Sequence, residues 1–337
     1  MRDRCITRDL VWGVPVPRPG FEAKVFYVWF DAPITYIAAT KEWSDANTTE
    51  HDWRSWWWQS RDVQYLQFLG KDNVPFHTVS FPATLLGSGE PWKTADVIKG
   101  FHWLTYEGGK FSTSQHRGVF TDAALDVLPA DVWRWWLIAN APESADVDFS
   151  FRRFAGDIGK DLADVFGNLA TRTTTFACQA FNGRIPVDGE PGASERALAH
   201  EVDRRIAVLR GWHENLQFRR AAAETRALWV LANGYIQEQA PWTTIKIDPT
   251  RAAVTTRTAL NLLTLGAVVG WSIIPSLANR VLSAFGNATG CPPWPDRPAS
   301  RLLDTRKGQS IPRIEPLVGK LTTEISHLET RFSGTEG

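Results

Sequence analysis

Hydrophobic positions along the chain change their spacing near residue 150. Before it, short runs rich in β-branched and aromatic residues at 24–30 and 63–69 alternate with helix-like segments at 33–43 and 81–86. This alternation predicts parallel strands joined by helical crossovers. Because only two or three strands are expected before residue 110, the pattern predicts the second half of a doubly wound sheet.

From Phe151 onward, hydrophobic residues recur at helical spacing and no strand is expected. The first of these helices runs for about 30 residues, roughly 45 Å at helical rise, and Gly286 is placed to cap the last one. The fold class is therefore α/β plus all-α, a partial Rossmann-like parallel sheet followed by an α-helical bundle. The expected divisions are 1–103, 104–150, 151–290 and 291–337, the last an extended chain that covers the bundle.

Composition narrows the classes of partner. Lys plus Arg and Asp plus Glu number 37 each, so bulk charge gives no argument for DNA or an anionic membrane. The longest apolar run, 262–275, is shorter than the ~20 residues that a membrane span needs. Cys5, Cys178 and Cys291 lie too far apart for a zinc knuckle or a disulfide framework, which favours a reducing, cytoplasmic location and no zinc site.

The segment Gly70–His77 follows the predicted strand 63–69, at the kind of strand end where open α/β sheets hold ligands. Asp72 and His77 give it a carboxylate and an imidazole, which suit a polar small molecule. The same composition is also that of an ordinary loop. His77 would serve equally to bond a ligand or to satisfy a backbone carbonyl.

Upstream, Trp29, Ala32, Pro33 and Tyr36 follow the apolar run 24–30. Aromatic walls beside the start of a short helix would form an apolar slot suited to an unbranched hydrophobic side chain. Packing in the core explains these residues equally well, and for Trp29 alone it is the better explanation.

Downstream, Lys110-Phe111-Ser112-Thr113-Ser114 follows Gly108-Gly109, which predicts a mobile loop. An ammonium group with two hydroxyls suits phosphate oxygens, which need charge and several donors. A solvated loop without a ligand is the alternative.

In the long helix, Asn168 and Arg172 are four residues apart and share one face. An amide and a guanidinium so placed suit the edges of unstacked RNA bases. Trp242, directly after Pro241, would stack on a base. A solvated helix face and a core tryptophan are the plainer alternative.

Five ordered motifs together resemble one family. They are 28–36 (VWFDAPITY), 68–77 (FLGKDNVPFH), 110–114 (KFSTS), 168–172 (NLATR) and 239–242 (QAPW). In order and spacing they resemble the methionyl-tRNA synthetases, and the resemblance runs from about residue 4 to about residue 325. It implies a class I aminoacyl-tRNA synthetase, a methionine-tRNA ligase that uses ATP with Mg²⁺ to make methionyl-adenylate and transfers methionine to tRNA(Met).

The resemblance also implies roles. The methionine side-chain pocket would comprise Trp29, Ala32, Pro33, Tyr36 and His77, with Asp72 beside the polar part of the amino acid or adenylate. Lys110, Ser112 and Ser114 would belong to the KMSKS-type loop that holds the triphosphate. Asn168, Arg172 and Trp242 would read the anticodon. Residues 1–103 would then be part of the catalytic domain, 104–150 the loop and stem-contact region, and 151–290 the anticodon-binding domain.

Three departures from the family pattern shape the expected function. No HIGH motif occurs in the sequence, Thr113 stands where the loop has its later lysine, and Thr35 replaces a glycine beside Tyr36. We therefore expect an incomplete or split ligase whose HIGH half lies on a separate chain. The alternatives are a non-catalytic paralogue that binds tRNA or an amino acid, and a truncated gene product.

Overall fold

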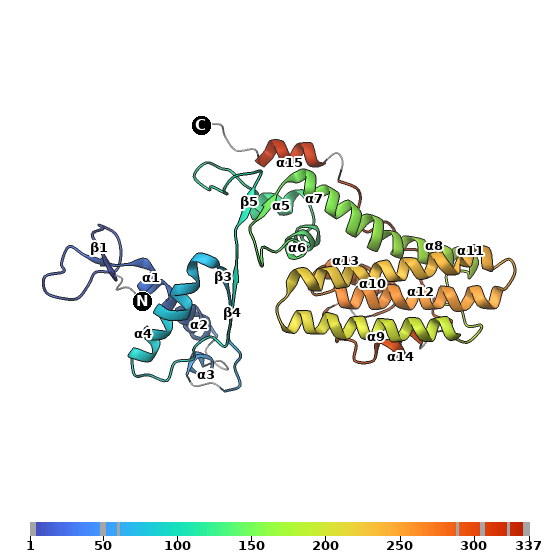
Figure 1. Cartoon of the computed structure of the whole chain (residues 1–337), viewed down its shortest axis with the longest axis horizontal. Helices are drawn as coiled ribbons and strands as arrows, with labels where there is room; N and C mark the ends of the chain where they lie inside the picture. The colour runs from blue at the N-terminus through green and yellow to red at the C-terminus, as the bar shows by residue number, and fades with distance from the viewer. Residues whose placement is uncertain are drawn as a thin grey trace. The chain divides into compact units, whose positions relative to one another are not determined.

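The computed structural model describes residues 5–47, 52–58, 61–287, 290–303, 307–321 and 324–332. The chain divides into two compact units, Met1–Trp103 and Leu104–Gly337 (Figure 1). The first mixes short strands with helices, and the second is mostly helical. The predicted order of an α/β part followed by an all-α part is confirmed.

A parallel strand pair lies in the first unit. β3 (Leu66–Gly70) pairs in register with β4 (Val97–Phe101). Between them lie a 3₁₀ turn (Lys71–Asn73), a π-helix (Phe76–Ser80) and α4 (Phe81–Gly87). The sequence correctly predicted the strand at 63–69, the helix after it and parallel rather than antiparallel strands, but it did not predict β4 as the partner.

The predicted strand at 24–30 is wrong. β2 comprises only Val25–Phe26 and runs antiparallel to β1 (Thr7–Arg8). The chain is helical from α1 (Val28–Asp31) through a 3₁₀ turn (Ala32–Ile34) to α2 (Thr35–Ala46). An unbroken apolar run has no period of two or 3.6, so spacing alone cannot separate a buried strand from a buried helix.

The first unit has a small core. Its cluster of buried residues, within the described part of the chain, comprises Ile37, Trp57, Phe81 and Leu85. Trp57 belongs to α3 (Trp53–Trp57), and its indole N–H donates to Thr40 Oγ1 at 2.9 Å. Only short helices therefore converge on this core.

The second unit opens with a second parallel pair, β5 (Leu104–Tyr106) and β6 (Val147–Phe149), with α5 (Thr121–Val127) and α6 (Ala130–Ala139) between them. Trp135 and Trp136 of α6 are both 1% exposed. The tryptophans of α6 therefore fill the core.

One long helical segment then leads away from the strands: α7 (Phe151–Ile158), a π-helix (Gly159–Gly167) and α8 (Asn168–Ala180). A Cβ on Gly167 would lie 2.9 Å from the backbone oxygen of Leu162, so the wide turn admits only glycine there. Sequence periodicity predicted the helix but not its π-helical middle.

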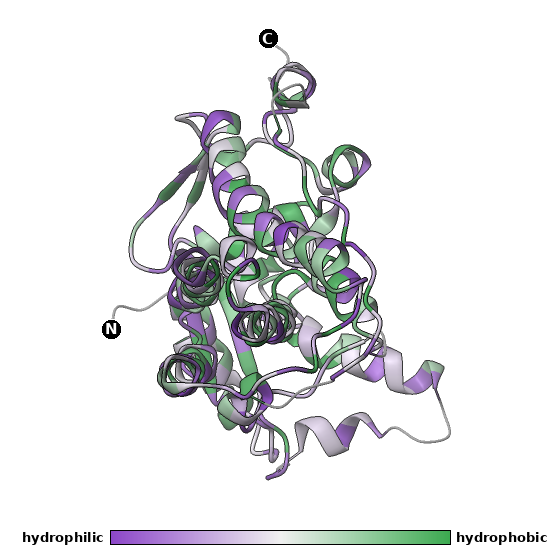
Figure 2. Ribbon diagram, turned by 90° about the vertical axis from the view of Figure 1, so that its right-hand side faces the viewer, coloured by the Kyte–Doolittle hydropathy of each residue, from purple (hydrophilic) through white to green (hydrophobic). Residues whose placement is uncertain are grey.

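The bundle is completed by α9 (Ala193–Glu214), α10 (Phe218–Gln239), α11 (Pro241–Thr244), α12 (Pro249–Gly270) and α13 (Pro275–Ala284). Figure 1 shows α9, α10 and α12 side by side. The ribbon carries both hydrophobic and hydrophilic residues on its helices (Figure 2). α9 buries one stripe, which includes Leu198, Val202, Ile206 and Leu209, as amphipathic packing requires.

At the centre of the bundle, Trp229 is fully buried. Its ring stacks on Phe166 at 4.5 Å, and its N–H donates to the oxygen of Gly266 at 3.1 Å. α12 is long and apolar enough to cross a membrane, but 83% of its most apolar window is buried in the protein. Such burial is typical of a core helix.

The tail differs from the extended chain that was predicted. α14 (Pro298–Leu303) packs against α9 and α12, and α15 (Glu324–Phe332) packs against α7. Part of the predicted tail, at 304–306, 322–323 and 333–337, lies outside the described residues. The predicted cap is confirmed, because Gly286 has φ +67° and its N–H donates to Ser283.

Candidate functional site

An aromatic cluster of Trp29, Tyr36, Phe76 and His77 lies in the first unit. The Trp29 ring stacks on Phe76 with centroids 4.9 Å apart, and His77 lies edge-on to it at 6.4 Å. The Tyr36 ring is tilted against that of His77, with centroids 5.8 Å apart. Trp29 and Tyr36, from neighbouring helical turns, and the π-helical His77 thus converge on one place, as the predicted pocket requires.

Hydrogen bonds fix the imidazole at the centre of this aromatic cluster. His77 is 3% exposed, and its Nδ1 lies 2.9 Å from the backbone oxygen of Asn73. Because a carbonyl only accepts, Nδ1 carries the proton in the neutral ring and donates it. Nε2 is then an acceptor for the hydroxyl of Tyr36 at 2.9 Å. Of the two alternatives for His77, the structure shows the hydrogen bond to a backbone carbonyl, and bonding to a ligand stays a prediction.

Among the other predicted pocket residues, Ala32 and Pro33 lie in the 3₁₀ turn between Trp29 and Tyr36, and Asp72 lies in the 3₁₀ turn after β3. Pro33 is buried, Ala32 is half-buried and Asp72 is exposed after the end of β3. Thr35 is exposed at the start of α2. Asp31 was not singled out, but its Oδ1 is buried with no hydrogen-bond partner among the described residues. A buried acceptor without a donor beside the aromatic cluster is a feature that only the fold reveals.

The predicted phosphate loop lies in the second unit and is ordered as a tight turn. Backbone hydrogen bonds of 2.9 Å join Ser112 and Arg117 in both directions. Lys110 is exposed and forms no ion pair within the described residues. Ser112 Oγ lies 3.3 Å from Ser114 Oγ, so two hydroxyls meet on one side of the turn.

The three residues predicted to read bases also lie in the second unit. Asn168 and Arg172 are on α8, and Asn168 is exposed at its first turn. The guanidinium of Arg172 lies 4.4 Å from the centroid of the Trp242 ring, a cation–π contact. Partial burial lowers the pKa of Arg172, and no described carboxylate pairs with it. We call Arg172, Trp242 and Asn168 the RNA platform, after the role predicted for them.

Two residues of this surface were missed from the sequence. The amide oxygen of Gln237 accepts a hydrogen bond from Arg172 at 2.8 Å, and Phe176 meets the Trp242 ring edge-on at 6.5 Å. The spacing of Phe176 from Arg172 on α8 was a usable signal. Gln237 had none, because it reaches Arg172 only through the packing of α10 on α8.

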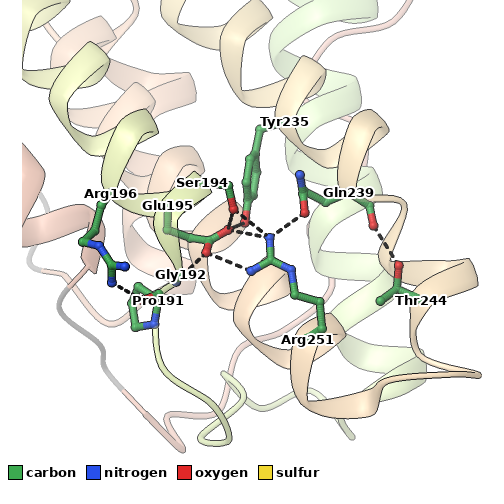
Figure 3. A network of polar contacts seen from close by, with 9 residues as sticks. All are labelled: Pro191, Gly192, Ser194, Glu195, Arg196, Tyr235, Gln239, Thr244 and Arg251. Carbon is green, nitrogen blue, oxygen red and sulfur yellow. Dashed lines mark hydrogen bonds and ion pairs between the residues drawn. The ribbon is translucent and has the colours of Figure 1, made fainter.

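An ion pair joins Glu195 of α9 to Arg251 of α12 (Figure 3). Glu195 is fully buried and accepts two hydrogen bonds of 2.8 Å from Arg251, one of 2.7 Å from Tyr235 and one of 2.8 Å from the Gly192 N–H. Burial raises the pKa of Glu195, but the hydrogen bonds from Arg251, Tyr235 and Gly192 outweigh it and hold that pKa at about 2. The carboxylate is therefore charged at neutral pH.

The described residues contain no group of three or more His, Cys, Asp or Glu side chains suited to a metal ion, and the three cysteines are free. A cavity of about 380 Å³ lies beside α9 and α14, lined by Asp203, Arg210, Trp294 and Asp296. None of the predicted site residues lines it.

Comparison with known proteins identifies the family. The family described as "tRNA synthetases class I (M)" matches residues 1–174, and the "Anticodon binding domain of methionyl tRNA ligase" matches residues 185–337. The methionine–tRNA ligase of Cereibacter sphaeroides (strain ATCC 17029 / ATH 2.4.9) is 50% identical, and that of Caulobacter vibrioides (strain NA1000 / CB15N) is 51% identical. Each match covers 99% of this chain and 60% of the relative.

Solved structures agree. Mycobacterium tuberculosis methionyl-tRNA synthetase in complex with methionyl-adenylate superposes with a TM-score of 0.76 at 26% identity, covering 94% of this chain and 60% of that one. The chain thus spans about 60% of the length of its relatives. The small parallel sheets and the helical domain are those of a class I synthetase. The chain belongs to the methionyl-tRNA synthetase family.

Proposed function

We propose that the protein containing these residues is a methionine–tRNA ligase, which activates methionine with ATP and transfers it to tRNA(Met). The observation that carries this proposal is the convergence of Trp29, Tyr36 and His77 in one aromatic cluster. A cytoplasmic location is part of the proposal, because the product is used in translation.

The chemistry of the cluster suits methionine. The thioether is polarizable and packs well against aromatic ring edges, and its unbranched chain fits between flat walls. The rings of Trp29 and Tyr36 supply those walls, and Asp72 takes the polar end of the amino acid. Calorimetry should therefore show binding in the order methionine, norleucine, leucine, and Trp29→Ala should abolish the difference. Equal binding of all three by the unmodified chain would contradict the assignment.

In the activation step, a carboxylate oxygen of methionine attacks the α-phosphorus of ATP. The bond from that phosphorus to the bridging oxygen breaks, and pyrophosphate leaves with Mg²⁺, whose ligands are phosphate oxygens and water. We assign Lys110, Ser112 and Ser114 to the departing phosphates. The exposed ammonium of Lys110 and the adjacent hydroxyls of Ser112 and Ser114 support this assignment.

We further propose that Lys110, Ser112 and Ser114 act together with residues of the HIGH type. A mixture of this chain with the amino-terminal part of the Cereibacter relative should give methionine-dependent exchange of pyrophosphate into ATP. In that reconstituted assay, Lys110→Ala should lower the rate about 10²–10³-fold. An unchanged rate with Lys110→Ala would contradict its assignment to the departing phosphates.

The RNA platform is assigned to the anticodon. Its cation–π pair offers a ring for base stacking and a guanidinium for base edges or phosphate. Trp242→Ala should weaken binding of a CAU anticodon stem-loop by about 1–3 kcal/mol. Trp56→Ala, at an exposed tryptophan of the first unit, is the control and should change nothing. Normal RNA binding without exchange in the reconstituted assay would instead favour a non-catalytic paralogue.

A further inference from the structure

Trp242 stands on an unusual turn. α10 ends at Gln239, and the next residue, Ala240, has φ +39° and ψ +60°, the left-handed region. A residue with a Cβ disfavours this region, so neighbouring contacts must hold it there. Pro241 and Trp242 follow at once in α11. The direction of the Trp242 ring therefore depends on the conformation of Ala240.

Gln239 is fixed at both its backbone and its side chain. Its backbone oxygen accepts a hydrogen bond from Thr244 Oγ1 at 2.9 Å, which closes the turn around Ala240. Its side-chain oxygen accepts a hydrogen bond from Arg251 (Figure 3). The residue that precedes the left-handed turn is thus tied to α12.

Arg251 is itself held in one orientation. Both of its terminal nitrogens bond the two oxygens of Glu195, a bidentate geometry that fixes the guanidinium plane. Its backbone N–H donates to Asp248, the residue that caps the start of α12. The fixed guanidinium then presents a donor to Gln239 (Figure 3).

We propose that Arg251 is a positioning residue for RNA binding. Acting through Gln239, it keeps Ala240 in the left-handed conformation and holds the Trp242 ring against Arg172. An ion pair linked to the platform through Gln239, with the carboxylate of Glu195 fully buried, thus controls how tightly the platform binds a base. This inference rests on the proposed function of the RNA platform.

The first test cuts the link and leaves the ion pair intact. Gln239→Leu removes the acceptor while Arg251 stays bonded to Glu195, so the bundle should remain folded. The full chain carrying Gln239→Leu should bind a CAU anticodon stem-loop about tenfold more weakly than the unmodified chain. Arg251→Met should have at least the same effect. All affinities are measured well below the melting temperature of each variant.

Arg257 supplies a matched control. It is an arginine of the same helix, α12, and is buried, whereas Arg251 is partly exposed. Its guanidinium donates to the backbone oxygens of Pro186, Asp188 and Gly189 and not to Gln239. Arg257→Met should lower the melting temperature as much as Arg251→Met without changing RNA affinity. Equal loss of RNA affinity in both variants would mean that Arg251 acts only through the stability of the bundle. That result would overturn the proposal.

Rescue tests the role of the turn. Glycine adopts the left-handed conformation freely, so Ala240→Gly added to Gln239→Leu should recover RNA affinity by about threefold. Because both proteins are fully folded during the measurement, a gain in stability alone would not produce this recovery. Absence of recovery would contradict an action through the turn.

A readout without RNA separates this inference from the proposed function. In protein labelled with 5-fluorotryptophan, the ¹⁹F resonance of Trp242 is assigned by its loss in Trp242→Phe. Gln239→Leu should shift this resonance, and Arg257→Met should not. If the unmodified chain binds no stem-loop while the resonance still shifts, the RNA function fails and the positioning stands. If the stem-loop binds, but Gln239→Leu changes neither affinity nor resonance, the positioning proposal is overturned.

Discussion

The aromatic cluster of the first unit and the RNA platform of the second are supported in opposite ways. The aromatic cluster is built on short helical turns, Tyr36 is 43% exposed, and the core beneath it is small. The platform rests on helices of 13 and 22 residues over a continuous core, and an ion pair with a fully buried carboxylate is linked to it through Gln239. Rings in the aromatic cluster are held mostly by each other, whereas Trp242 is held by distant parts of the bundle.

This difference predicts how each region fails. Deleting a core side chain of the bundle should lower the free energy of unfolding strongly, but the surrounding helices should still hold the fold. In the first unit, few contacts position the ligand-binding groups. Loss of one ring or one hydroxyl should therefore change their arrangement. The following experiments measure this contrast.

The largest effect is expected at Trp229. Trp229→Ala should lower the free energy of unfolding of the second unit by about 3–5 kcal/mol, because it leaves a cavity among Phe166, Gly266 and their neighbours. Hydrogen exchange under mild denaturant should show lost protection only in peptides of the second unit. Trp57→Ala is the matched change in the first unit and should lower hydrogen-exchange protection in that unit alone. Loss of protection in both units from either variant would contradict independent cores.

Acid should act next most strongly, through Glu195. Its pKa of about 2 lies below the 4.5 of the free group, so its contribution is complete above about pH 5 and is lost as pH falls toward 2. The stability of the second unit should fall by on the order of 3 kcal/mol across this window. Denaturant unfolding followed by circular dichroism at pH 7, 5 and 3 measures the change. Glu195→Gln should be less stable at pH 7 and show a flatter pH dependence.

A substitution in the π-helix tests how the platform is aligned with the core. Gly167→Ala places a Cβ against the backbone oxygen of Leu162, which should cost about 1–3 kcal/mol in unfolding free energy. Gly211→Ala in α9 is the control, since nothing lies within 4 Å of its Cβ, and it should stabilise slightly. A neutral Gly167→Ala would show that the π-helical turn is not required.

The last substitution should change stability least and still weaken ligand binding by the aromatic cluster. Tyr36→Phe removes the hydroxyl that donates to His77 Nε2, and the methionine dissociation constant should rise about fivefold, or ~1 kcal/mol. Calorimetric titration with methionine measures it. Tyr65→Phe removes a hydroxyl that accepts from Gln67 instead, and should leave methionine affinity unchanged. Equal effects of the two variants would mean that the His77 contact has no special role.

The sequence by itself determined much of this protein. Helical spacing gave the long segment from Phe151 and the bundle helices, because periodic apolar faces need partners wherever they occur. Five motifs in order gave the family and the candidate residues. The apolar run at 24–30 was misassigned, because an all-apolar segment has no period from which strand and helix can be told apart.

Only the tertiary structure decided how those residues meet. The bond between Tyr36 and His77 joins positions 41 residues apart, and that between Arg172 and Gln237 joins positions 65 apart. The link from Glu195 through Arg251 to Gln239 crosses three helices. Such contacts depend on how helices pack against each other, and packing is set by the summed fit of many side chains, which no local pattern in one sequence records.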